Sequence, residues 1–191
     1  CREDRSMCGW CYSSRRFFRS PSAGNSPPMT SSGKKGRRLD ALPPAEVRLV
    51  VAGSRSYNNY ADFCRWLQEY LDDHGWDQTT DLVFISGKAR TGADNMVIEF
   101  CQEFGYDWVE YPAQWRDEHG KLDMGAGYRR NQEMANVANY AVLFWDGMSR
   151  GTDHMHNACM RRFKKKQMLE EPFTYIVEPD PAPVYEDLFW S

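Results

Sequence analysis

The stretch Val47-Arg-Leu-Val-Val-Ala-Gly53 decides the fold class. It is a short apolar run that ends at a glycine, which is typical of a strand buried on both faces of a parallel sheet. Residues 59–73 follow with apolar side chains at helical spacing. A buried strand, a glycine and an amphipathic helix in this order predict the first unit of an α/β fold.

The same alternation continues along the chain. Further strands are expected at residues 82–85, 108–111, 140–145 and 173–177, and further helices around 96–104, 127–138 and 150–166. Five strands and four helices predict a Rossmann-like three-layer α/β sandwich, with a five-stranded, mainly parallel sheet and helices on both faces. In such sheets, ligands bind outside the carboxyl ends of the strands, near the point where the strand order reverses.

The segments that flank this pattern differ from it in composition. Residues 1–44 are rich in Ser, Pro, Gly and Arg, and we expect them to be a disordered basic tail. Met29 begins a stretch typical of a protein start, so residues 1–28 are expected to be an upstream extension or the result of a misplaced start. The folded domain is expected at residues 45–178, and residues 179–191 are an acidic tail rich in proline and aromatic residues.

Charge is distributed unevenly over the 191 residues. The net charge is −3, but residues 1–44 hold nine basic and three acidic side chains, a balance of +6, which leaves −9 for the rest. An acidic domain is a poor surface for nucleic acid, because neutralisation of phosphates dominates such binding. With no run of about 18 apolar residues and no secretory signal, we expect a cytoplasmic protein without membrane contact. Whether it forms a homo-oligomer stays open.

Candidate metal ligands do not form a site. Cys8 and Cys11 have the spacing of half a zinc site, but no second pair follows them. His154 and His156 lie two residues apart in a predicted helix, where their side chains point about 200° apart. The sequence therefore predicts no metal.

Three glycine-containing loops follow strands of the predicted sheet, at residues 53–57, 86–94 and 146–152. Glycine lets the backbone approach a ligand, and amides at a following helix N-terminus bind phosphate. Candidate ligand-binding residues in the loops are Gly53, Ser54, Arg55, Ser86, Gly87, Lys88, Thr91, Gly92, Asp94, Asp146, Ser149, Gly151 and Thr152. A helix-capping role for Asp94 is an equal alternative. The expected ligand is a nucleotide or an ADP-ribose-like compound.

Five motifs occur in order along the chain. They are Gly53-Ser-Arg55, Ser86-Gly-Lys-Ala-Arg-Thr-Gly-Ala-Asp94, Pro112-Ala-Gln-Trp115, Gly127-Tyr-Arg-Arg-Asn-Gln-Glu-Met134 and Phe144-Trp-Asp-Gly-Met-Ser-Arg-Gly-Thr152. Together they resemble the YspA/YpsA-related branch of the SLOG superfamily, Rossmann-like proteins of bacteria and phages, over about residues 47–177.

This resemblance implies a domain that binds a nucleotide or a nucleotide-derived signal, as a sensor, sequestering or processing module. It also implies that Trp115 lines the pocket and stacks on a base, and that Arg130 and Asn131 face the ligand. Lys88 departs from the family pattern, which often has a second glycine at this position.

Two functions from different classes compete: a binding module and a hydrolase of N-glycosidic bonds. Related phosphoribohydrolases carry a glutamate where this chain has Met155, and a thioether cannot transfer a proton. Asp94, Glu99 or Asp146 could replace that glutamate, so the catalytic residues of a hydrolase stay unknown. We expect ligand binding, with Arg55 and Arg130 outside the buried core and contributing little to folding.

Overall fold

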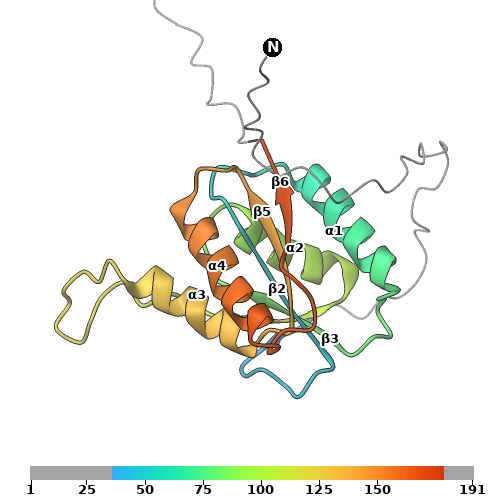
Figure 1. Ribbon diagram of the computed structural model, residues 1–191, viewed down its shortest axis with the longest axis horizontal. Coiled ribbons are helices and arrows are strands. Elements are labelled where there is room, and N and C mark those ends of the chain that lie inside the picture. The colour runs from blue at the N-terminus through green and yellow to red at the C-terminus, as the bar shows by residue number, and fades with distance from the viewer. Residues whose placement is uncertain (1–35, 179–191) are drawn as a thin grey trace, which may run out of the picture. The chain divides into compact units, whose positions relative to one another are not determined.

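The computed structural model describes residues 36–178, drawn in colour in Figure 1. Its helices are α1 (Tyr60–His74), α2 (Ala93–Phe104), α3 (Ala126–Val137) and α4 (Arg150–Lys164). Its strands are β1 (Arg38–Leu39), β2 (Val47–Gly53), β3 (Leu82–Ser86), β4 (Asp107–Glu110), β5 (Tyr140–Trp145) and β6 (Phe173–Ile176). The predicted α/β class is confirmed, with every predicted strand and helix present.

All six strands belong to one parallel sheet in the order β1-β4-β3-β2-β5-β6. From β2 the chain builds outward through β3 to β4, and then returns to place β5 on the other side of β2. The strand order therefore reverses between β2 and β5, where Gly53 pairs with Phe144. This reversal is the point at which parallel sheets open a crevice for ligands.

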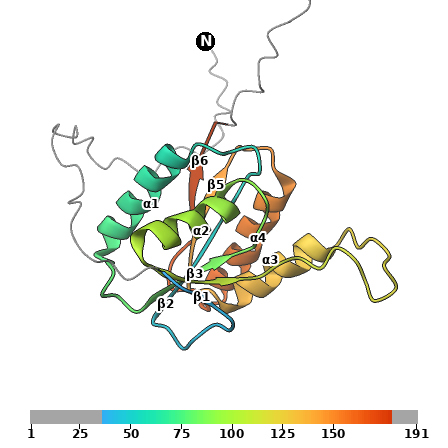
Figure 2. The ribbon, with the colours of Figure 1, turned by 180° about the vertical axis from the view of Figure 1, so that it is seen from behind.

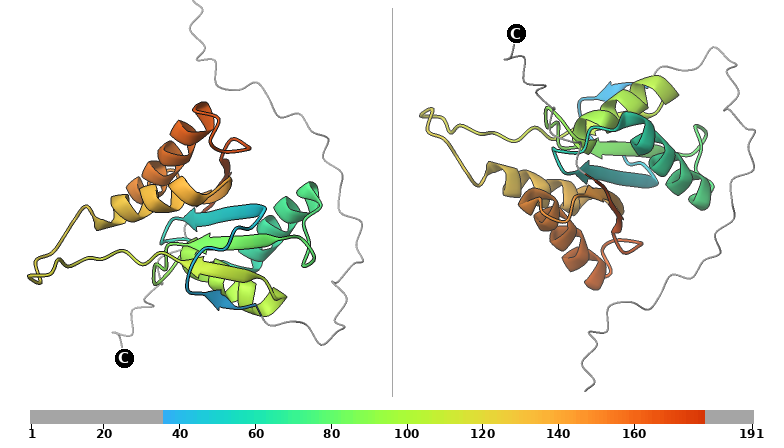
Figure 3. Two further views of the ribbon diagram at one scale, coloured as in Figure 1. Left: turned by 90° about the horizontal axis from the view of Figure 1, so that it is seen from below. Right: turned by 90° about the horizontal axis from the view of Figure 1, so that it is seen from above.

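The helices form two layers around the sheet. Helices α1 and α2 cover one face and α3 and α4 cover the other, as the views from below and from above show (Figure 3). The view from behind places α1 and α2 in front of the strands (Figure 2). Leu49 and Val51 of β2 pack in the first layer, whereas Val50 packs in the second, and all three are fully buried. Burial on both faces explains the unbroken apolar run of this strand.

The prediction of five strands was wrong by one, because β1 lies in the segment expected to be disordered. Arg38 pairs with Trp108 of β4, and Leu39 packs beside Val83 and Val109. A strand of two residues is too short to produce an alternating pattern, so its sequence carries no strand signal. Residues 1–35 of the basic tail, with Cys8 and Cys11, and residues 179–191 lie outside the described residues.

Candidate functional site

A cavity of about 520 Å³ lies at the carboxyl ends of β2 and β5, within the size range of small-molecule sites. It is lined by the loops that follow these strands and by residues at the starts of α2, α3 and α4. Ten of the predicted ligand-binding residues line it: Gly53, Arg55, Asp94, Trp115, Arg130, Asn131, Asp146, Ser149, Gly151 and Thr152.

Three predicted residues lie behind the cavity wall instead. The hydroxyl of Ser54 accepts the amide of Asp146 at 3.1 Å, which ties the loop after β2 to the loop after β5. The hydroxyl of Ser86 donates to the carbonyl oxygen of Asp94 at 2.6 Å. Gly92 has a φ of +79°, and a Cβ there would lie 2.4 Å from the carbonyl oxygen of Ser54. These residues shape the loops and do not line the cavity.

Gly53 is required by the close approach of three elements. A Cβ at this position would lie 2.4 Å from the carbonyl oxygen of Phe144 and 2.9 Å from the Cβ of Ala93. Any side chain would therefore push β2 away from β5 or away from the start of α2. Glycine here brings the N-terminus of α2 to the crevice, as the sequence motif predicts.

Arg130 and Asp94 form a largely buried ion pair, with side chains 12% and 5% exposed and 3.7 Å between Nη1 and Oδ1. The guanidinium also donates to the carbonyl oxygen of Gly87, and the Asp94 carboxylate accepts the amide of Gly87 at 3.0 Å. Burial raises the pKa of Asp94, and the charge of Arg130 opposes that rise. Arg130, expected outside the buried core, is largely buried, because α3 packs this side chain against the loop after β3.

Asn131 joins the starts of α3 and α4. Its side-chain amide donates to the carbonyl oxygen of Gly151 at 2.9 Å, and its Oδ1 accepts Nε of Arg130 at 3.1 Å. The side chain is 4% exposed. It therefore fixes the position of the α4 N-terminus relative to Arg130.

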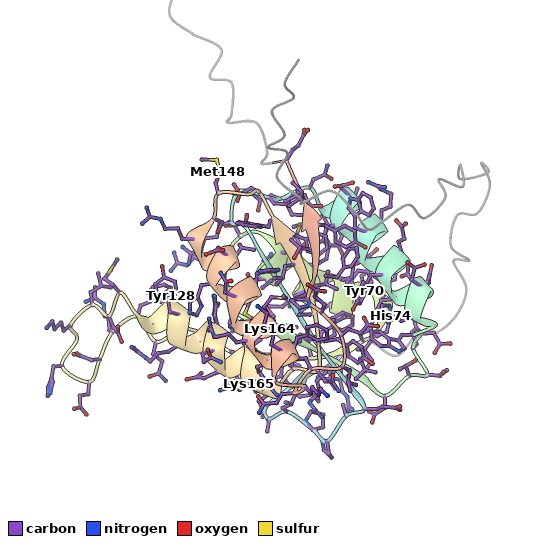
Figure 4. All side chains as sticks on the ribbon, viewed as in Figure 1. Tyr70, His74, Tyr128, Met148, Lys164 and Lys165 are labelled. Atoms are coloured by element: carbon purple, nitrogen blue, oxygen red, sulfur yellow. The ribbon has the colours of Figure 1, made fainter. Side chains whose placement is uncertain are left out.

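The loop between β5 and α4 is held by Asp146. Its carboxylate accepts the amides of Met148 and Ser149 at 2.9 and 2.8 Å, and the hydroxyl of Ser56 at 2.8 Å. Partial burial raises the pKa of Asp146, but these hydrogen bonds outweigh it and lower the pKa to about 2. The Met148 side chain projects outward from this loop (Figure 4), and only the backbone amide of this residue contacts Asp146.

Replacing Asp146 by alanine is expected to lower the free energy of unfolding by about 1–2 kcal/mol at neutral pH, after allowance for solvent screening. The folded-state pKa is depressed, so this stabilisation is present above the unfolded pKa of about 3.9 and is lost as pH falls towards about 2. Urea denaturation of both proteins should show a smaller difference at about pH 3 than at about pH 7. An equal difference at both pH values would contradict this role.

The N-terminus of α4 faces the cavity with unpartnered donors. Ser149 caps the helix by accepting the amide of Thr152, and the Thr152 hydroxyl donates to Ser149 Oγ at 3.1 Å. Among the described residues, the amides of Arg150 and Gly151 have no hydrogen-bond acceptor. Unpaired amides at the positive end of a helix dipole are suited to bind an anionic oxygen.

One wall of the cavity is aromatic. Trp115 is 41% exposed and packs on the start of α3, where a Cβ on Gly127 would lie 3.2 Å from the indole ring. The guanidinium of Arg55 lies 5.9 Å from the centre of the same ring. Tyr128, which lies at the surface of α3 (Figure 4), and Met124 extend the wall.

Sequence reasoning missed Tyr128 and Met124 as lining residues. Tyr128 belongs to the motif beginning at Gly127 and could have been found there, whereas nothing in the sequence marks Met124.

The cavity lacks an uncommitted carboxylate among the described residues. Asp94 is paired with Arg130, and Asp146 is bonded to its own loop. Glu99 does not line the cavity and accepts the side-chain amide of Asn95 at 2.6 Å. Met155, 1% exposed, also lines the cavity, and its thioether cannot transfer a proton. The geometry therefore offers donors and cations for an anion, and no carboxyl group poised for proton transfer.

Comparisons of the chain with protein-family models, with curated proteins and with solved structures find no match. Within residues 36–178, no three His, Cys, Asp or Glu side chains gather closely enough to hold a metal ion. The same part of the chain contains no helix long and apolar enough to cross a membrane.

Proposed function

We propose that the cavity binds a nucleotide or a nucleotide-derived ligand, and that the protein acts as a binding module for it. The observation that carries this proposal is the position of the α4 N-terminus. Its unpartnered amides at Arg150 and Gly151 belong to a helix that starts at the reversal of strand order, and Gly151 lines the cavity. In parallel sheets, phosphate groups bind at such helix starts.

The remaining lining residues suit the other parts of a nucleotide. Arg55 has no carboxylate partner among the described residues and is available to a phosphate. Trp115 and Tyr128 present aromatic surface on which a base can stack. The cavity of about 520 Å³ thus combines an anionic and an aromatic subsite.

The order of the sequence motifs supports the same proposal, because it resembles the YspA/YpsA-related branch of the SLOG superfamily. Gly53, Asp94, Arg130 and Asp146 come from four separate motifs of that series, and all four line one cavity. A cytoplasmic location would fit a nucleotide ligand. We favour binding over hydrolysis of an N-glycosidic bond, because Met155 and the committed carboxylates leave that reaction without a general acid.

A panel of AMP, ADP, NAD and ADP-ribose should contain at least one compound that raises the Tm. At 100 times its dissociation constant, a ligand that binds only the folded state adds about 2.7 kcal/mol to stability. Differential scanning fluorimetry measures the shift. A panel without any stabilising compound would contradict the proposal.

The matched variants for this measurement are Arg55→Ala and Arg65→Ala. Each arginine is exposed and lies over a tryptophan, Arg55 over Trp115 and Arg65 over Trp66, but only Arg55 lines the cavity. Loss of a charge-assisted hydrogen bond at Arg55 should weaken binding by about 1.5–3 kcal/mol, and the Arg65 variant should bind normally. Equal binding by both variants would mean that the ligand occupies another site.

A further inference from the structure

A second cavity, of about 570 Å³, adjoins the first. Arg55, Ala89, Trp115 and Arg130 line both cavities, so the two spaces share a wall. The second cavity is formed mainly by residues 87–91, in the loop between β3 and α2. Each cavity alone lies within the range of small-ligand sites, so a mononucleotide would occupy only one of them.

The lining of the second cavity is cationic. It contains Arg55, Lys88, Arg90 and Arg130 and no carboxylate. Two of these charges are compensated from outside the lining: Lys88 pairs with Glu110 at 2.5 Å, and Arg130 pairs with Asp94.

Arg55 and Arg90 have no carboxylate within ion-pair distance among residues 36–178. Their combined charge matches the −1.5 to −2 that a phosphate monoester carries at about pH 7.

The backbone of the loop adds directed donors. Lys88 has a φ of +51°, a left-handed conformation that turns the chain after Gly87. The amides of Gly87 and Lys88 are used inside the protein, by Asp94 and by the hydroxyl of Ser86. The amides of Ala89, Arg90 and Thr91 have no acceptor in the part of the chain that the structure describes. Successive amides after a left-handed residue form a concavity suited to anions.

From these features we propose that the second cavity holds a second phosphate group of the same ligand. The ligand is then a nucleotide with phosphate groups at two separated positions, here called bis-anionic. One phosphate lies at the N-terminus of α4 and the other at residues 87–91. Arg55 and Trp115 lie on the wall shared by the two cavities and contact the part of the ligand between them. This inference rests on the proposed function and narrows its ligand class.

Isothermal titration with AMP, adenosine 3′,5′-bisphosphate and NADP tests the inference. AMP carries one phosphate, and the other two carry phosphates at two separated positions. We expect the better bis-anionic compound to bind at least about tenfold more tightly than AMP, the gain typical of further charge-assisted hydrogen bonds. Arg90→Ala should remove most of this gain and change the affinity for AMP by less than about twofold. Arg65→Ala, outside both cavities, is the control.

The outcomes separate the two proposals. If AMP binds as tightly as both bis-anionic compounds, or if Arg90→Ala weakens all three equally, the second phosphate site is wrong and the nucleotide site stands. If none of the three compounds binds, and the wider panel also fails, the proposed function falls and this inference falls with it. Circular dichroism of Arg90→Ala verifies folding, which should be unaffected because this side chain is exposed.

Discussion

Replacing Arg130 by alanine is expected to lower the free energy of unfolding by about 3–5 kcal/mol at neutral pH. The substitution leaves the Asp94 carboxylate, 5% exposed, without its cationic partner, and leaves the carbonyl oxygen of Gly87 without a donor. An uncompensated buried charge costs far more than a lost surface contact. Urea denaturation followed by tryptophan fluorescence measures the loss.

The pH dependence of this loss identifies its cause. Burial raises the pKa of Asp94 even with Arg130 present, and removal of Arg130 raises that pKa further. A carboxyl group with a raised folded-state pKa lowers the free energy of unfolding least below its unfolded pKa of about 3.9. Its destabilising effect grows as pH rises through the folded-state pKa. The deficit of the variant should therefore be smaller at about pH 4 than at about pH 7. A deficit independent of pH would exclude the ion pair as its source.

Two further variants complete the test of the buried pair. Adding Asp94→Asn to Arg130→Ala removes the unpaired charge and keeps an acceptor for the amide of Gly87, so part of the lost stability should return. Arg129→Ala is the matched control, because Arg129 lies on the same helix as Arg130 but is 61% exposed. Its partner Asp123 precedes the helix. This control substitution should lower the free energy of unfolding by about 0–1 kcal/mol.

Gly53→Val is expected to destabilise the protein by about 3 kcal/mol, the upper end for overpacked sites. The added Cβ would meet the carbonyl oxygen of Phe144 at 2.4 Å, and a backbone atom of a central strand cannot move aside as a flexible side chain can. The measurement is the urea midpoint, with ligand affinity as a second readout, since separation of β2 from β5 would distort the cavity.

Gly151→Ala is the counterpart of this substitution. A Cβ at Gly151 would meet only the hydroxyl oxygen of Ser149, at 4.0 Å, and the residue lies in α4. Alanine should therefore leave stability unchanged or raise it by up to about 1 kcal/mol. If Gly53→Val proves as stable as Gly151→Ala, the close approach of β2 to β5 is not required for the fold.

The sequence predicted the sheet well because its central strands are buried on both faces. Val50 and Val51 belong to different helix layers, and both must be apolar, which produces the run that identifies β2. Parallel strands then bring their carboxyl ends to one edge, so loops far apart in the chain could be expected to meet. The ends of β2 and β5 do so at the cavity.

The arrangement within the site depends on tertiary contacts that no local pattern records. Arg130 and Arg129 are adjacent and of the same type, yet one is largely buried and the other lies at the surface. Lys88, expected to contact the ligand, lies in the loop after β3 and pairs with Glu110 at the end of β4. Asp146 lines the cavity, and its carboxylate is bonded to the amides of its own turn.

The short strand β1 has a consequence for aggregation. It covers the side of β4 that would otherwise present unpaired backbone groups beside Trp108 and Val109. An uncovered edge strand can pair with the same strand of another molecule, whereas a two-residue strand offers too few groups to act as a template. Arg38 also reaches the carboxylate of Glu110, at 3.4 Å, and so helps to hold this cover in place. A shortened protein that is meant to stay monodisperse should therefore begin no later than Gly36.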